Sequence, residues 1–223
     1  WRSKAAIRGL SNQNKWLVAL RVGAETGATI AFLTALKHMP LANVSAILLA
    51  LPLAVTMAAA LFLGEPVGWR RWSAIIVGFV GVLIVIRPGL EGFNIYSLSA
   101  LVAVAFITVR EITTRRLTSD VPSLTVALWT TIGITTFSAV IMAGTEWRAV
   151  SQLSWLLLLG AAVAILFGSL LSVMAMRVGE ISFVAPFRYT AMIWAIALGI
   201  LIFGEWPDQP TLIGTGIIIG TGI

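Results

Sequence analysis

The chain has 223 residues, of which 59% are hydrophobic and 11% charged, whereas soluble domains carry about 25% charged residues. This composition excludes an ordinary soluble fold and predicts an all-α integral membrane protein. Lys and Arg outnumber Asp and Glu by 15 to 9, but the bases lie between apolar blocks, where they set membrane topology rather than form a nucleic-acid surface. Cysteine is absent and His38 is the only histidine. Disulfides and thiolate metal sites are therefore excluded, and a histidine-based metal site is not expected.

The apolar residues form eight blocks, each close to the roughly twenty residues that a helix needs to cross a bilayer. Short loops with turn residues separate the blocks, and Lys and Arg favour alternate loops. The first helix is therefore expected to run outward through the inner (cytoplasmic) membrane of a multi-pass protein. The eight expected helices cover about 16–38, 41–63, 72–87, 96–114, 122–143, 153–176, 181–203 and 210 to the end.

A Gly-Glu pair ends two of these blocks, and the two pairs, Gly64-Glu65 and Gly204-Glu205, lie 140 positions apart. The sequence around the first pair aligns without a gap to the sequence around the second, so this offset indicates two structural units. The second unit has two helices before the matching part that the first unit lacks. An odd number of helices in each unit predicts opposite orientations in the membrane.

The expected protein is thus a ten-helix transporter of two inverted five-helix repeats, of which this chain holds about eight helices. The chain is expected to lack two helices at the N-terminus and the end of the last helix. Residues 1–89 are expected to hold a cytoplasmic stretch and the last three helices of the first repeat, and residues 90–223 to hold the second repeat.

The stops "GEP" and "GEW", the two five-helix units and the closing helix "WSAIIVGFVGVLIVIRPG" (72–89) resemble the drug/metabolite transporter superfamily, EamA type. The segments 109–117, "VREITTRRL", and 178–208 are similar to a subgroup that includes riboflavin and S-adenosylmethionine importers. The resemblance implies alternating access between the two units, without a metal or nucleotide cofactor. It implies uptake of riboflavin or a similar cofactor-like molecule, with export of amino acids, metabolites or drugs as the alternative.

A non-transporting structural membrane protein is the alternative of another class. An enzyme is disfavoured because Glu25 is the only acid that lies convincingly deep in an apolar block. The expected partners are a small-molecule substrate and the lipid bilayer, and a homodimer is left open.

Charged residues inside apolar blocks are costly, so they are candidates for function. Arg21 and Glu25 lie four positions apart on one helix face, close enough to pair. They predict either an anchor for a polar substrate or a proton-coupled carboxylate; a self-contained ion pair is the structural alternative.

The second candidate cluster lies in "APFRYTAMIW" (185–194), where Arg188 and Tyr189 follow a proline. Arg188 is expected to bind an anionic or carbonyl-bearing ligand, or to pair with Glu25. Tyr189, Trp194 and Trp129 are expected to stack on a flat ring or to hydrogen-bond, although most tryptophans mark membrane interfaces. Two further interpretations concern structure: Pro52 is expected to kink its helix, and Arg110 and Glu111 to anchor a helix end at the interface.

Overall fold

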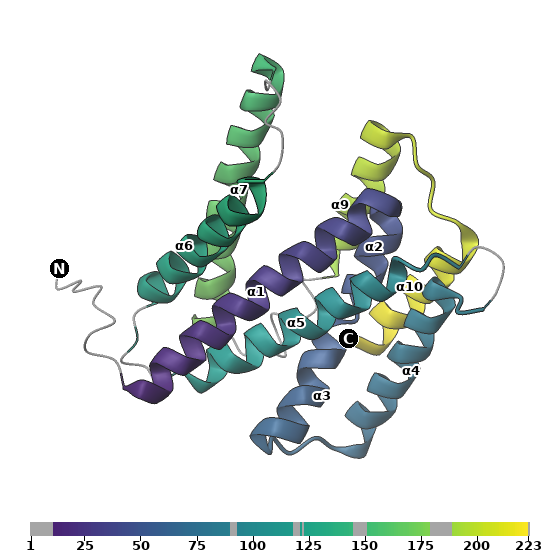
Figure 1. The fold of residues 1–223 in the computed structure, drawn as a ribbon. Helices are drawn as coiled ribbons and strands as arrows, with labels where there is room; N and C mark the ends of the chain where they lie inside the picture. Colours follow the sequence, from purple (N-terminus) through teal and green to yellow (C-terminus); the bar gives the residue numbers. More distant parts are fainter. Residues whose placement is uncertain are drawn as a thin grey trace.

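The computed structural model describes residues 11–89, 93–117, 121, 123–144, 151–178 and 189–222, and within these ranges every regular element is a helix (Figure 1). The all-α membrane fold expected from the sequence is confirmed. Within the described residues, five spans are long and apolar enough to cross a membrane: Asn12–His38, Leu41–Leu63, Trp69–Ile86, Ser97–Arg116 and Thr125–Met142. The block expected at 181–203 is described only from Tyr189 onward. The elements are α1 (Asn12–His38), α2 (Leu41–Leu48), α3 (Leu51–Leu63), α4 (Trp69–Ile86), α5 (Ser97–Arg116), α6 (Ser123–Met142), α7 (Gln152–Val178), α9 (Thr190–Leu198), the π-helix η2 (Gly199–Phe203) and α10 (Gln209–Gly222).

The helix boundaries repeat at the offset that the sequence predicts. Helices α1 and α7 each have 27 residues, and their first residues lie 140 positions apart. The same offset separates the last residues of α3 and η2, and the first residues of α4 and α10. The two repeats therefore share one plan of helices and turns.

The two Gly-Glu stops have the same local geometry because glycine tolerates the left-handed conformation that ends a helix. Gly64 has φ 67° and ψ 22°, and Gly204 has φ 67° and ψ 18°. In both stops the N–H of the following glutamate donates to the carbonyl six residues earlier, Glu65 to Ala59 at 3.3 Å and Glu205 to Gly199 at 3.0 Å. The two Gly-Glu pairs therefore form the same C-terminal helix cap.

Helix α2 lies at the centre of the packed region and is separated from α3 by Leu49 and Ala50. Pro52, at the start of α3, has no N–H and so takes away the donor that the Leu48 carbonyl would meet in a continuous helix. The kink expected at Pro52 is thus present as a break. Four side chains of α2, those of Ala42, Val44, Ala46 and Ile47, are fully buried, and α2 packs against α5, α9, α4 and α10.

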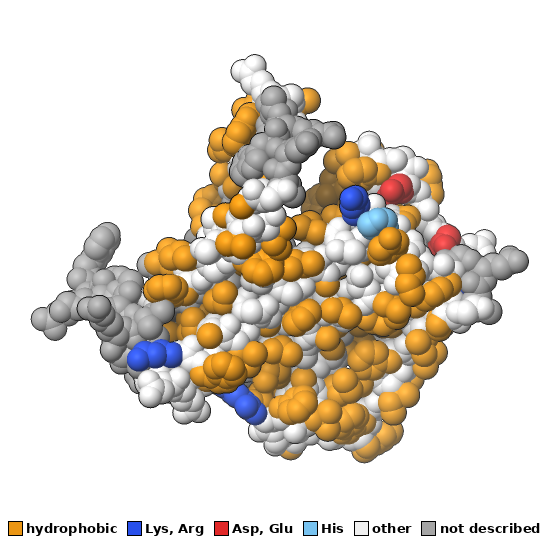
Figure 2. Space-filling view, in the orientation of Figure 1, with side chains coloured by type: hydrophobic (Ala, Val, Ile, Leu, Met, Phe, Trp, Pro, Cys, Tyr) orange, Lys and Arg blue, Asp and Glu red, His pale blue; other side chains and the backbone are white. Residues whose placement is uncertain are grey.

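The outer surface is apolar, as expected of a chain surrounded by lipid tails (Figure 2). Large exposed side chains lie along α7, including Leu153, Trp155 and Leu156. Helix α1 packs along α5 and also contacts α6, as Figure 1 shows. Its counterpart α7 exposes every residue from Gln152 to Phe167 except Ser154.

Helices α4 and α10 approach closely at two glycines, Gly81 and Gly214. A Cβ atom added to Gly214 would lie 2.5 Å from the Gly81 carbonyl oxygen and 2.5 Å from a Val85 methyl group, whereas one added to Gly216 would meet nothing within 4 Å. Small residues at such crossings let two membrane helices pack backbone to backbone.

We predict that Gly214→Ala destabilises the full-length protein by about 1–3 kcal/mol, because the added methyl group forces α4 and α10 apart. The matched variant Gly216→Ala on the same helix should be neutral. Thermal unfolding of the purified protein in detergent measures both. Equal midpoints for the two variants would contradict this packing.

Candidate functional site

The Glu25 carboxylate of α1 forms an ion pair with Arg110 of α5. Arg110 Nη1 lies 2.9 Å from Glu25 Oε1 and 2.8 Å from Oε2, and Arg110 Nη2 lies 2.8 Å from Glu111 Oε1. The side chains of Glu25 and Arg110 are 22% and 24% exposed, and that of Glu111 is 10% exposed. Glu25 lies thirteen residues from either end of α1. A charge at this depth is tolerated because its opposite charge comes from the neighbouring helix.

Arg21 lies one helical turn before Glu25, but Glu25 pairs with Arg110 in its place. The reason is geometric: Arg110 faces the carboxylate across the interface of α1 and α5 and reaches both oxygens through one nitrogen. Arg21 is left with its Nε and Nη1 atoms buried, and in the described part of the chain neither has a hydrogen-bond partner. A guanidinium with unmade hydrogen bonds offers donors to a carbonyl, carboxylate or phosphate oxygen.

The prediction that Arg110 and Glu111 are interfacial anchors was wrong. Both lie near the last turn of α5, which suggested the interface, but their side chains turn inward to the ion-pair network. A pattern in the sequence does indicate that Glu111 is buried. Glu111 continues the spacing of Ala100, Val104 and Thr108, the buried face of α5, so it falls on the helix stripe that packs against neighbours.

None of the other candidate residues that the structure describes forms a hydrogen bond or an ion pair with this network. Arg188 falls outside the described residues, and its role stays a prediction. Tyr189 directly precedes α9; it is 4% exposed, and its hydroxyl has no partner among the residues described. Trp194 is 67% exposed on α9, which favours contact with lipid over a pocket. Trp129 lines an apolar groove of about 630 Å³ between α1 and α6.

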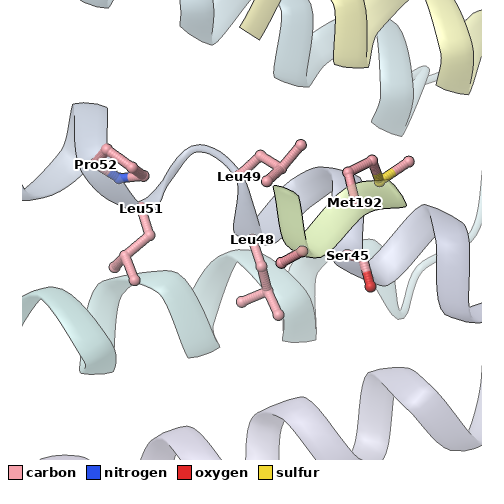
Figure 3. A pocket seen from close by; sticks show the side chains of 7 residues that line it. Ser45, Leu48, Leu49, Leu51, Pro52 and Met192 are labelled. Carbon is pink, nitrogen blue, oxygen red and sulfur yellow. The ribbon is translucent and has the colours of Figure 1, made fainter. Parts of the chain in front are cut away.

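A second cavity, of about 260 Å³, lies where α2 breaks from α3 and meets α9 (Figure 3). Its lining is apolar apart from Ser45, and Pro52 and Met192 face it from equivalent positions of the two repeats. Near-midplane cavities beside interrupted helices are typical of substrate paths in transporters with inverted repeats. The lining residues are Ser45, Leu48, Leu49, Leu51, Pro52, Ala191 and Met192.

The sequence model of the EamA-like transporter family matches residues 2–87 and 94–222. The chain belongs to this family. A riboflavin transporter of Vibrio cholerae is 31% identical over 78% of this chain and 58% of its own length. An S-adenosylmethionine uptake transporter of Rickettsia bellii is 28% identical over 82% of this chain and 63% of its own length.

A pseudopaline exporter of Pseudomonas aeruginosa is 24% identical over 85% of this chain and 67% of its own length. The chain therefore spans about six tenths of the length of the first two relatives. A solved structure described only as "Crystal structure of protein" has a TM-score of 0.64 and 21% identity, and the match covers 96% of this chain and 78% of that one. This likeness shows the fold.

We predict that Arg110→Met destabilises the full-length protein by about 3 kcal/mol, because Glu25 and Glu111 lose the cation that compensates them. Adding Glu25→Gln to this variant should restore part of the loss. The exposed Arg71→Met serves as a control that removes one arginine without breaking a buried pair. Thermal unfolding in detergent tests all three, and an unfolding midpoint for Arg110→Met equal to that of Arg71→Met would refute the structural role of the network.

Proposed function

We propose that the complete protein moves a small organic metabolite across the inner membrane by alternating access, with uptake of riboflavin or a similar cofactor-like molecule as the leading assignment. The observation that carries this proposal is the charged network inside the helix bundle, at Glu25, Arg110 and Glu111, beside Arg21, whose buried Nε and Nη1 have no hydrogen-bond partner among the described residues. A structural membrane protein has no need of charges at that depth, whereas ionisable residues inside a membrane helix bundle mark substrate or ion pathways. The relatives are named as transporters, which agrees with the proposal.

Arg21 is the residue that we assign to substrate recognition. Its free N–H groups match the acceptor oxygens that riboflavin carries on its ring and S-adenosylmethionine carries on its carboxylate. The Glu25–Arg110 pair holds α1 against α5 and so sets the position of Arg21 one turn away. Tyr189 and Arg188 are assigned to the same path from the second repeat, and Trp129 is the remaining candidate for ring contacts, whereas Trp194, exposed on α9, is assigned to lipid contact.

Growth of a riboflavin auxotroph on low external vitamin tests the direction and the substrate together. We predict that expression of the full-length protein rescues growth. Failure of rescue combined with resistance to a toxic metabolite would favour an exporter, as in the pseudopaline relative. A chain that changes neither growth nor resistance, although it is present in the membrane, would favour a structural role.

For recognition, we predict that Arg21→Gln lowers uptake of labelled substrate into vesicles at least about tenfold at low concentration, because hydrogen bonds to a charged donor contribute about 1.5–3 kcal/mol. The loss should appear mainly as a higher KM. Lys37→Gln is the matched control, since Lys37 is an exposed base at the end of the same helix. Unchanged uptake by Arg21→Gln, with folded protein at the normal level, would remove Arg21 from the site.

A further inference from the structure

The first turn of α2 is capped by a residue from the other repeat. Pro40, which precedes the helix, provides no side-chain cap. Instead the Leu41 N–H donates to Oε2 of Glu205 over 3.1 Å, across 164 positions of sequence. A carboxylate at a helix N-terminus satisfies a free donor and complements the helix dipole. Glu205 is held in place by the left-handed turn at Gly204.

A second contact holds the same turn of α2. Thr211 of α10 is fully buried, and its Oγ1 lies 3.1 Å from Asn43 Oδ1. The Thr211 N–H in turn donates to Asp208 Oδ1 at 3.0 Å, and Arg87 also pairs with Asp208. Burial by itself would raise the pKa of Asp208, but the hydrogen bonds from Thr211 and Arg87 lower it. The Asp208 carboxyl group therefore stays ionised.

The last turn of α2 leads into a turn at Leu49 and Ala50, where the Leu49 N–H donates to the Ser45 carbonyl at 3.1 Å and the Ala50 N–H to the Ile47 carbonyl at 3.1 Å. The helix ends at Leu48, and the break at Leu49 and Ala50 separates it from α3. The cavity that contains Ser45 and Met192 lies at this break. Helix α2 is therefore a short helix whose first turn is hydrogen-bonded to the second repeat and whose last turn ends at a helix break beside the cavity.

We propose that α2 is a gate of the transport path, and that Glu205 and Thr211 hold it closed at their end of the bundle. Opening requires the Leu41–Glu205 and Asn43–Thr211 bonds to break while α2 swings about the break before Pro52. The proposal rests on the alternating-access function proposed above. The Gly-Glu stop at 204–205 then has a second role besides ending its own helix, because the turn at Gly204 places the Glu205 carboxylate against the first turn of α2.

The repeat mate Glu65 provides an internal comparison. It follows the same left-handed cap, but its Oε1 pairs with Arg115 Nη1 at 2.9 Å and its side chain is 50% exposed. Since Glu205 contacts the start of the Leu41–Leu63 span and Glu65 follows its end, the two glutamates lie at opposite ends of the bundle. Removing Glu65 should leave the Glu205 end closed.

These 223 residues contain no cysteine, so Ser45→Cys introduces a single thiol beside the cavity of the full-length protein once any cysteine outside them is replaced by serine. We predict that adding Glu205→Ala raises the labelling rate of this thiol by an impermeant maleimide at least about tenfold in intact cells. Glu205→Gln, which keeps an acceptor oxygen, should raise it less, and Glu65→Ala should leave it unchanged. Inverted vesicles repeat the assay from the other face, so the membrane orientation need not be assumed. Equal rates for Glu205→Ala and its parent on both faces would overturn the gate.

Cross-linking separates the gate from the transport function. Asn43→Cys with Thr211→Cys, bridged by a short thiol cross-linker with a cleavable disulfide, should abolish transport of the labelled substrate, and reduction should restore it. Labelling at position 45 requires no transport, so a positive labelling result with no transported substrate would refute the proposed function alone. Full transport by the cross-linked protein would refute the gate alone.

Discussion

The interior of a membrane offers no water, so every charge and helix end placed there must find its partner within the protein. In this chain the partners come from distant segments. The Glu25 carboxylate on α1 meets Arg110 on α5, and the first N–H of α2 meets the carboxylate of Glu205. Because each contact joins helices far apart in sequence, the need to satisfy polar groups also determines how those helices pack.

Local features of the fold could be predicted from the sequence because their causes are local. The length of an apolar block sets the length of a membrane helix, so most boundaries lie within a few residues of those expected. Gly64 and Gly204 end their helices since glycine accepts the left-handed conformation, and Pro52 breaks its helix since it lacks an N–H. The repeat offset follows from the same signals.

The partners across helix interfaces could not be predicted in this way. A spacing of four places Arg21 beside Glu25 on one helix, but it does not reveal that Arg110 arrives from another. The position of Glu205 at a helix end does not reveal that it caps α2, because that helix begins 164 positions earlier in the sequence. The exposure of Trp194 likewise depends on which face of α9 the neighbouring helices cover. Such features require the packing, which one sequence leaves undetermined.

The repeats differ at the partly buried charges of α1 and agree at the Gly-Glu helix ends. Ala161 and Ile165 of α7 stand where α1 has Arg21 and Glu25. A second charged cluster would require its own partners, since an uncompensated charge costs at least about 2.5–3.5 kcal/mol at a helix centre. One charged cluster is sufficient for a single transport path. Alternating access, in contrast, requires a closure at each end of that path. We infer that Arg21 and Glu25, which break the repeat, serve the substrate path, whereas the preserved Gly-Glu stops end helices at the two faces of the bundle.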